Sequence, residues 1–186
     1  MAYRTGTYVA FDGLGETNPT KSDFRFYTTM KGWHGSRHIN FKLTDSHEKT
    51  YSVRDTSSTE TLKARINERL AASKQLVVIL SPDTRKTGSM LSYEIKRAVD
   101  VYELPLICAY TGYNGIWGLS DTLTSRWPHS LRERINNGSV DAIHIPFKKE
   151  AIFDAIGRFY VNGESIGSSK SCYSKDYQIK MGCIEG

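Results

Sequence analysis

The sequence predicts an α/β protein with a three-layer, flavodoxin-like architecture, in which helices cover both faces of a five-stranded parallel sheet. Short apolar, β-branched segments alternate with segments of helical periodicity along the chain. Two of the strand segments, Gln75–Leu80 and Leu104–Ala109, are apolar along almost their whole length, as strands covered on both faces must be. Right-handed crossovers between such strands favour the strand order 2-1-3-4-5.

The first half of the chain predicts three strands and two helices. In order these are a short apolar strand, a helix, an alternating half-exposed strand, a polar loop, a second helix and a buried strand. The second helix opens with a capping box, in which Glu60 follows Ser57 by three residues. The predicted elements are a strand over Thr5–Phe11, a helix over Ser22–Trp33, a strand over Ile39–Leu43, a loop over Thr44–Thr56, a helix from Ser57 and a strand over Gln75–Leu80.

The second half predicts two more strands, three helices and one long connection. The connection, Tyr110–Trp127, is long for a compact domain, so it either has a function or contains a short element of its own. The following helix is bracketed by Pro128 at its first turn and Gly138 just past its end. The remaining elements are a helix over Ser89–Tyr102, a strand over Leu104–Ala109, a strand over Asp141–Pro146 and a helix over Lys149–Tyr160.

Length and composition predict one α/β domain over residues 1–161, with a C-terminal extension over 162–186 packed on or beside it. The chain has no apolar run long enough for a membrane span and no secretory signal. Its 3 cysteines are too few for a disulfide scaffold. We therefore expect a cytoplasmic protein. The net charge of +5 comes from scattered residues, which favours a basic surface over a specific nucleic-acid site.

Several common sites are excluded by missing residues. Gly13-Leu14-Gly15 lacks the third glycine of a dinucleotide-binding loop, and the chain has no GxxxxGK[ST] sequence. His34 and His38 have no carboxylate or cysteine nearby that would complete a metal-ligand set, so no metal is expected. Ser89 and Ser92 lack the GxSxG context of a serine hydrolase. A phospho-acceptor receiver domain would need an acidic pair after the first strand, where only Asp12 is found.

Glu94 is the candidate that remains. Ligands of open α/β sheets bind beyond the carboxyl ends of the strands. The segments that follow these ends are here Phe11–Gly15, Thr44–Thr56, Ser81–Ser89 and Tyr110–Trp127. Glu94 lies in the first turns of the helix that begins at this edge, at the border of its apolar stripe. A carboxylate at that position would line a cleft. Alternatively, it is a surface residue paired with Arg97 or stabilising the helix start.

Residues 5–110 resemble a known family. The segment QLVVILSPDTRKTGSMLSYEIKRAV is similar to the third strand, loop and helix of TIR and TIR-like domains, where a Ser-containing loop precedes a Trp-x-x-x-Glu segment. YVAFDG, DFRFYTTMKGW and LPLICAY are similar to the short TIR-like proteins typified by ThsB of the bacterial Thoeris antiphage defence system. The family often has Trp four positions before the Glu, where this chain has Met90.

The resemblance implies an NAD+ nucleosidase or ADP-ribosyl cyclase that cleaves the nicotinamide–ribose bond. Glu94 would then be the catalytic residue. Phe11 would pack against the ligand, Asp12 and Gly13 would shape its phosphate or ribose side, and Ser89 would donate near the helix start. NAD+ would be a substrate, and no cofactor is implied. The product would be ADP-ribose or, as in Thoeris systems, a cyclic isomer made for signalling.

The partners implied in the same way are further copies of the chain, an effector reached through the diffusible nucleotide, and a phage-derived trigger. Tyr113, Trp117 and Trp127 of the long connection would either fold the adenine back or cover a core edge.

Two alternative functions remain open on the residues alone. One is a non-catalytic TIR-type interaction module, and the other is an enzyme like a nucleoside deoxyribosyltransferase, in which a glutamate attacks C1′.

Overall fold

The computed structural model describes residues 4–16, 18–35, 42–44 and 59–186. Its centre is a parallel sheet with the strand order β2-β1-β3-β4-β5-β6. The predicted α/β class and the order 2-1-3-4-5 are therefore confirmed, and a sixth short strand extends the sheet beyond β5. The strands are β1 Gly6–Ala10, β2 Lys42–Thr44, β3 Ser73–Leu80, β4 Leu106–Tyr110, β5 Ala142–Pro146 and β6 Ser171–Cys172.

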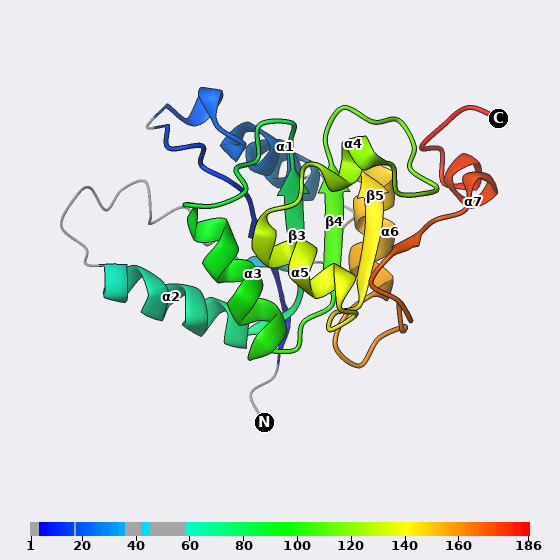
Figure 1. Cartoon of the computed structure of the whole chain (residues 1–186). Coiled ribbons are helices and arrows are strands. Elements are labelled where there is room, and N and C mark those ends of the chain that lie inside the picture. Colours follow the sequence, from blue (N-terminus) through cyan, green and yellow to red (C-terminus); the bar gives the residue numbers. More distant parts are fainter. Residues whose placement is uncertain (1–3, 17, 36–41, 45–58) are drawn as a thin grey trace.

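The helices form a layer on each face of the sheet, as Figure 1 shows. Helices α2, α3 and α5 cover one face, and α1 and α6 cover the other. The described helices are the 3-10 turn η1 Pro19–Lys21, α1 Phe24–His34, α2 Thr59–Ala71, α3 Met90–Asp100, α4 Asp121–Thr124, α5 His129–Asn136, α6 Lys149–Arg158 and α7 Lys175–Lys180.

Side-chain alternation along the central strands divides the core in two. In β1, Tyr8 and Ala10 pack toward the α2–α3–α5 layer, while Val9 and Phe11, which directly follows the strand, pack toward α1 and α6. The strand β3 alternates in the same way. Every residue of β1, β4 and β5 is buried, which explains why these segments have few polar side chains. Full burial of one large aliphatic side chain stabilises the fold by about 1.5–3 kcal/mol.

The predicted elements agree with the observed ones to within a few residues at each end. The long connection does contain a short helix, α4, whose start is capped by the Ser120 hydroxyl. Most of the second predicted strand, the loop over 44–56 and the capping box at Ser57 lie outside the described residues. Of that predicted strand, only its last two residues fall within the observed β2.

The C-terminal segment joins the sheet and also supports the long connection. Strand β6 pairs with β5, with Ser171 opposite Ile143. The buried Gln178 amide then pairs with the backbone of Ile116 from both sides. Its Nε2 donates to the Ile116 carbonyl at 2.7 Å, and its Oε1 accepts from the Ile116 amide at 2.9 Å. These bonds satisfy a buried backbone amide and a buried backbone carbonyl that would otherwise be unpaired.

A buried chain of hydrogen bonds also holds the C-terminal segment near its start, at Ser169. Trp127 Nε1 donates to the Tyr110 hydroxyl at 2.6 Å, so this hydroxyl must donate its own proton to His144 Nδ1, 2.8 Å away. His144 Nε2 then carries the remaining proton and donates to the Ser169 carbonyl at 3.0 Å. Burial lowers the pKa of His144 to about 4, and the neutral tautomer fits this arrangement.

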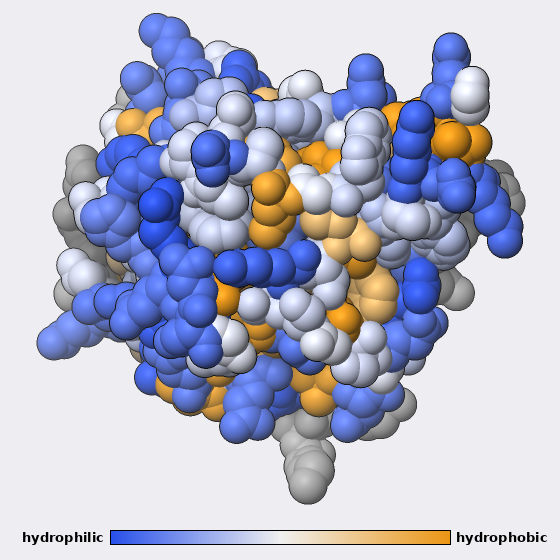
Figure 2. Space-filling model, turned by 45° about the vertical axis from the view of Figure 1, so that its right-hand side comes forward, coloured by the Kyte–Doolittle hydropathy of each residue, from blue (hydrophilic) through white to orange (hydrophobic). Residues whose placement is uncertain are grey.

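The surface seen in Figure 2 is mostly hydrophilic, with apolar side chains in small separate groups. Among the described residues, the large hydrophobic side chains that are exposed are Val101 and Trp117. None of the helices in the described part of the chain has both the length and the apolar character needed to cross a membrane.

Candidate functional site

A cavity of about 320 Å³ opens at the carboxyl edge of the sheet, beside the end of β1 and the start of α3. It is lined by the loop after β1, the loop between β3 and α3, and the first turns of α3. All five residues predicted from the sequence as site residues line it. The full lining is Phe11, Asp12, Gly13, Gly15, Glu16, Arg85, Ser89, Met90, Leu91 and Glu94.

Glu94 is the buried carboxyl group of this cavity. The sequence predicts it at the border of the apolar stripe of α3. The structure buries it more deeply than a border position implies, because only 3% of the residue is exposed. Here α3 packs against β1, and the Tyr8 hydroxyl, from β1, donates to Glu94 Oε1 at 2.6 Å. Burial raises the pKa of Glu94 to about 8, the Tyr8 hydrogen bond opposes that rise, and Asp12 adds to it. The carboxyl group is therefore largely protonated at neutral pH when the cavity is empty.

Asp12 connects the two loops that form the mouth of the cavity. Its carboxylate is fully buried and accepts from the backbone amides of Leu14 and Arg85 at 2.9 and 2.8 Å. The Arg85 side chain pairs with the same carboxylate through Nε at 3.1 Å and Nη2 at 2.7 Å. Because protein donors bind both oxygens of this carboxylate, its role is to hold the two loops together. Asp12 therefore shapes the mouth of the cavity by positioning both loops.

Phe11 and Ser89 provide two different kinds of surface. The Phe11 ring stacks on Tyr27, with 5.5 Å between the centroids, so it is fixed in place before any ligand enters. Ser89 is the N-cap residue of α3, but its side chain makes no capping bond. Its Oγ is buried and has no hydrogen-bond partner among the described residues. A polar group of this kind needs a partner, and a ligand in the cavity would supply one.

Sequence reasoning missed Tyr8 and Arg85. Both act through partners far away in the chain, since Tyr8 lies 86 residues before Glu94, and Arg85 lies 73 residues after Asp12. One signal for Tyr8 was available, because a hydroxyl in a buried strand needs a partner on the layer that it faces. Met90, which takes the place of the family's Trp, lines the cavity and packs on the core.

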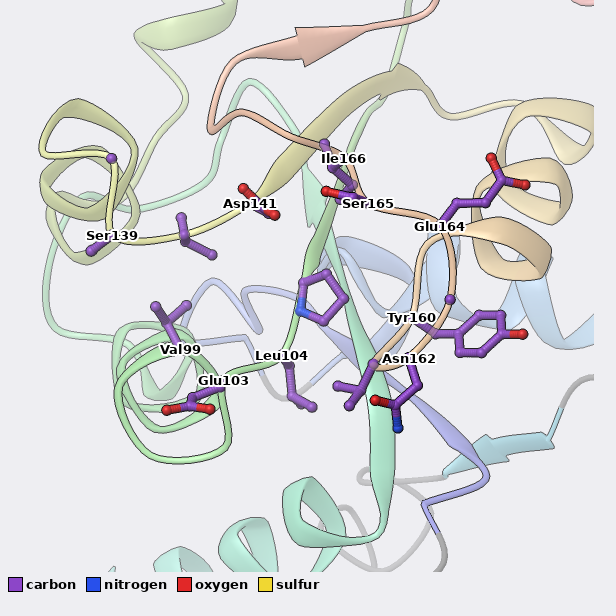
Figure 3. A pocket seen from close by; sticks show the side chains of 15 residues that line it. Val99, Glu103, Leu104, Ser139, Asp141, Tyr160, Asn162, Glu164, Ser165 and Ile166 are labelled. Carbon is purple, nitrogen blue, oxygen red and sulfur yellow. The ribbon is translucent and has the colours of Figure 1, made fainter.

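A larger cavity, of about 470 Å³, lies at the opposite edge of the sheet, near the starts of β4 and β5. Figure 3 shows the carboxyl groups of Glu103, Asp141 and Glu164 around it. Glu164 turns outward there and pairs with Arg158 at 2.7 Å. Within the described ranges, no Lys or Arg side chain lines this cavity beside its carboxylates, whereas Arg85 lines the Glu94 cavity, so the larger cavity is the less suited of the two to an anionic nucleotide. The described residues also contain no group of three or more His, Cys, Asp or Glu side chains that could hold a metal ion.

One known family matches the part of the chain that forms the Glu94 cavity. Residues 8–115 match the family described as "Thoeris protein ThsB, TIR-like domain". The chain belongs to the Thoeris ThsB TIR-like family. The match includes the last three residues of β1 and the whole of α3, and it covers every lining residue of the Glu94 cavity. Membership in the ThsB family places the chain in Thoeris antiphage defence.

Proposed function

We propose that this ThsB family member cleaves the bond between nicotinamide and ribose in NAD+, with Glu94 as the catalytic residue. The observation that supports this most is a buried carboxyl group in a cavity of suitable size at the carboxyl edge of the sheet. Ligand cavities in proteins have volumes of about 300–1,000 Å³. The apolar wall formed by Phe11, Met90 and Leu91 provides a surface for a flat aromatic ring.

The chemistry of NAD+ fits a site with one catalytic carboxylate. Ordinary glycoside hydrolysis uses a second carboxyl group to protonate the departing oxygen. The nicotinamide ring of NAD+ is already a cation. When its bond to C1′ breaks, the electron pair of that bond moves to the ring nitrogen, and nicotinamide leaves as a neutral molecule. Glu94 then has one task, which is to stabilise the positive charge that develops at C1′ and the ring oxygen.

The raised pKa of Glu94 makes this site sensitive to the charge of its ligand. A cationic ring beside the carboxyl group favours its ionised form, so binding of NAD+ would release a proton from Glu94. In the free enzyme, with a pKa of about 8, roughly a tenth of the molecules carry ionised Glu94 at pH 7. We therefore expect kcat/KM to rise about fivefold between pH 7 and pH 8 and about tenfold in all, levelling off above about pH 9.

The second half of the reaction decides the product. Attack of water at C1′ would give ADP-ribose and a proton, whereas attack by another atom of the same molecule would give a cyclic isomer. We propose the cyclic product, as Thoeris systems use a nucleotide signal. Trp127 of the long connection is buried against Tyr110, so it covers the core. Trp117 is 56% exposed and is the aromatic residue of that loop with most surface available to a ligand.

The partners follow from the same proposal. The protein would act through a separate effector that binds its diffusible product, and a phage-derived trigger would start the reaction. Assembly into homo-oligomers would order the site. The experiment is to incubate the purified protein with NAD+, with and without lysate from phage-infected cells, and to analyse the products by mass spectrometry. Release of nicotinamide in either condition supports the proposal.

Other outcomes of this experiment would favour another function. If nicotinamide appears in neither condition, and the lysate retains a partner on the protein, an interaction module is the better explanation. If the protein instead exchanges the bases of deoxynucleosides and leaves NAD+ intact, it is similar in function to nucleoside deoxyribosyltransferases. A cyclic product, rather than ADP-ribose, supports the signalling part of the proposal.

Replacing Tyr8 with phenylalanine is expected to move the pH profile to higher pH. The Tyr8 hydroxyl favours the ionised form of Glu94, so its loss raises the pKa of Glu94 further above the usual range. A hydrogen bond to a charged group contributes about 1.5–3 kcal/mol, which corresponds to a loss of roughly tenfold to a hundredfold in kcat/KM at pH 7. The activity should recover partly at pH 9 or above.

The matched control is Tyr93→Phe. Tyr93 precedes Glu94 in α3, and its hydroxyl accepts from Asn67 Nδ2 at 3.0 Å, outside the cavity. This variant loses the same atom and should keep the wild-type pH profile. A Tyr8→Phe profile that is lower at every pH but unshifted would show that Tyr8 has no effect on the ionisation of Glu94.

A further inference from the structure

Arg85 has two different edges, and only one of them is used by the protein. Nε and Nη2 are bound to Asp12. Nη1 makes no hydrogen bond to any described residue. A guanidinium group has five N–H groups, so both hydrogens of Nη1 and the second hydrogen of Nη2 remain for a ligand. The Arg85 side chain is 39% exposed while Asp12 is fully buried, so the unused edge is the accessible one.

The surroundings of this edge belong to the same cavity as Glu94. Arg85 lines the cavity together with Gly13, Gly15 and Ser89. Gly15 has a φ of +70°, and a Cβ there would lie 3.5 Å from Arg85 Nη1. A glycine at this position therefore leaves the space over Nη1 open as well as accommodating the backbone. Besides Asp12 and Glu94, the lining contains one further carboxylate, that of Glu16, which is exposed to water.

Two further features favour an anion beside Arg85. The amino end of α3, a helix of 11 residues, begins at the cavity, where its dipole favours negative charge. The Ser89 Oγ at this end is buried and lacks a partner among the residues described. The pKa of the Arg85 guanidinium is raised by its hydrogen bonds to Asp12, so the group keeps its positive charge.

We propose that Arg85 is the residue that binds the pyrophosphate of a dinucleotide, through the Nη1 edge that Asp12 leaves free, and that it thereby selects NAD+ over nicotinamide riboside. Asp12 fixes the guanidinium in advance, which lowers the entropy lost when a ligand binds. A planar group of this kind can bind a carboxylate on one edge and a phosphate on another. This inference rests on the proposed function, since it assigns a second part of the same substrate to the same cavity.

The test compares two substrates and three variants. NAD+ contains the pyrophosphate and nicotinamide riboside does not, while both contain the bond to be cleaved. Arg85→Lys keeps a positive charge for Asp12, but its single ammonium group does not also reach a ligand on a second edge. We expect this variant to lower kcat/KM for NAD+ by about tenfold to a hundredfold and to change the value for the riboside by less than about threefold. Arg85→Gln should also lose more on NAD+ than on the riboside, but it leaves the buried Asp12 carboxylate without its cation and should unfold at a lower temperature than Arg85→Lys.

The matched control is Lys86→Gln. It removes one positive charge at the next residue, but the Lys86 ammonium donates to the Thr84 carbonyl at 3.3 Å and does not line the cavity. Both kinetic values should stay at the wild-type level in this variant. Thermal unfolding of each variant shows whether the pairing with Asp12 has been preserved. An equal loss on both substrates, or no loss on either, would overturn the proposal for Arg85.

Binding of ADP-ribose separates this proposal from the proposed reaction. Calorimetry measures the dissociation constant of ADP-ribose without any bond cleavage. If the wild type binds ADP-ribose and Arg85→Lys weakens that binding by about tenfold or more, while Lys86→Gln does not, the assignment of Arg85 stands even if NAD+ is not cleaved. If the wild type does not bind ADP-ribose, or if Arg85→Lys binds it equally well, the assignment is wrong.

Discussion

Replacing Glu94 with glutamine is expected to lower the rate of nicotinamide release from NAD+ by about a hundredfold to a thousandfold, which is the usual effect of removing one group that stabilises a transition-state charge. The amide has almost the same size and carries no negative charge. It therefore occupies the cavity beside the substrate without stabilising the cation at C1′. The measurement is the rate of nicotinamide formation at saturating NAD+.

The fold of this variant should be unaffected. The glutamine Oε1 still accepts from the Tyr8 hydroxyl, which lies 2.6 Å from Oε1 in the wild type. The folded protein raises the pKa of Glu94 to about 8, well above the value of 4.5 for an unperturbed glutamate. Because ionisation of Glu94 is less favourable in the folded state, the free energy of unfolding decreases as pH rises above 4.5. This decrease is complete above about pH 8. A neutral glutamine removes this effect, so the melting temperature at pH 8–9 should equal or exceed that of the wild type.

Glu103→Gln is the control for the other cavity. It makes the same substitution beside the larger cavity at the opposite edge of the sheet. Nicotinamide release by this variant should match the wild type. Full activity of Glu94→Gln would remove Glu94 from the mechanism, and a loss that appears only in Glu103→Gln would move the reaction to the other cavity.

Replacing Asp12 with alanine should give the second large effect, on both stability and activity. The substitution leaves two backbone amides and the Arg85 guanidinium without their shared acceptor. Because Arg85 is 39% exposed, water can solvate it, and we expect a loss of about 3 kcal/mol in the free energy of unfolding. The two loops at the mouth of the cavity also lose their connection, so nicotinamide release should fall with stability.

The control pair is Arg158 with Glu164. Here too an arginine binds a carboxylate through Nε and a terminal nitrogen, at 2.9 and 2.7 Å, but the carboxylate is exposed. Glu164→Ala should therefore change the urea midpoint far less than Asp12→Ala does. Asp12→Asn keeps one acceptor oxygen and should lie between the alanine variant and the wild type. If Asp12→Ala unfolds at the wild-type midpoint, Asp12 does not hold the two loops.

The sequence was sufficient for those parts of the molecule that depend on local pattern. Continuous apolar runs identify β3 and β4 because both faces of these strands are covered. The phase of the apolar residues in α3 places Glu94 close to the cavity. The same pattern does not reveal how deeply Glu94 is buried, because that depends on the packing of α3 against β1 and on Tyr8 in particular.

Contacts between distant residues were beyond the same reasoning. The Asp12–Arg85 pair joins two loops that are adjacent only after β1 and β3 have paired. The strand β6 is two residues long and has no periodicity to recognise. The role of Gln178 is equally hidden, because a single glutamine in a polar segment looks like a solvated side chain until its partner at Ile116 is known.

The pairing of Gln178 with Ile116 has a practical consequence for expressing shortened forms of this protein. The family match ends at residue 115, one position before Ile116. A fragment cut there would lack β5 and α6 and would expose the apolar flank of β4 to water. Even a cut at the end of α6 would leave the backbone amide and carbonyl of Ile116 without their Gln178 partner and would release the long connection. Fragments for crystallisation or assay should therefore run at least through α7, and fusion partners are better attached beyond it.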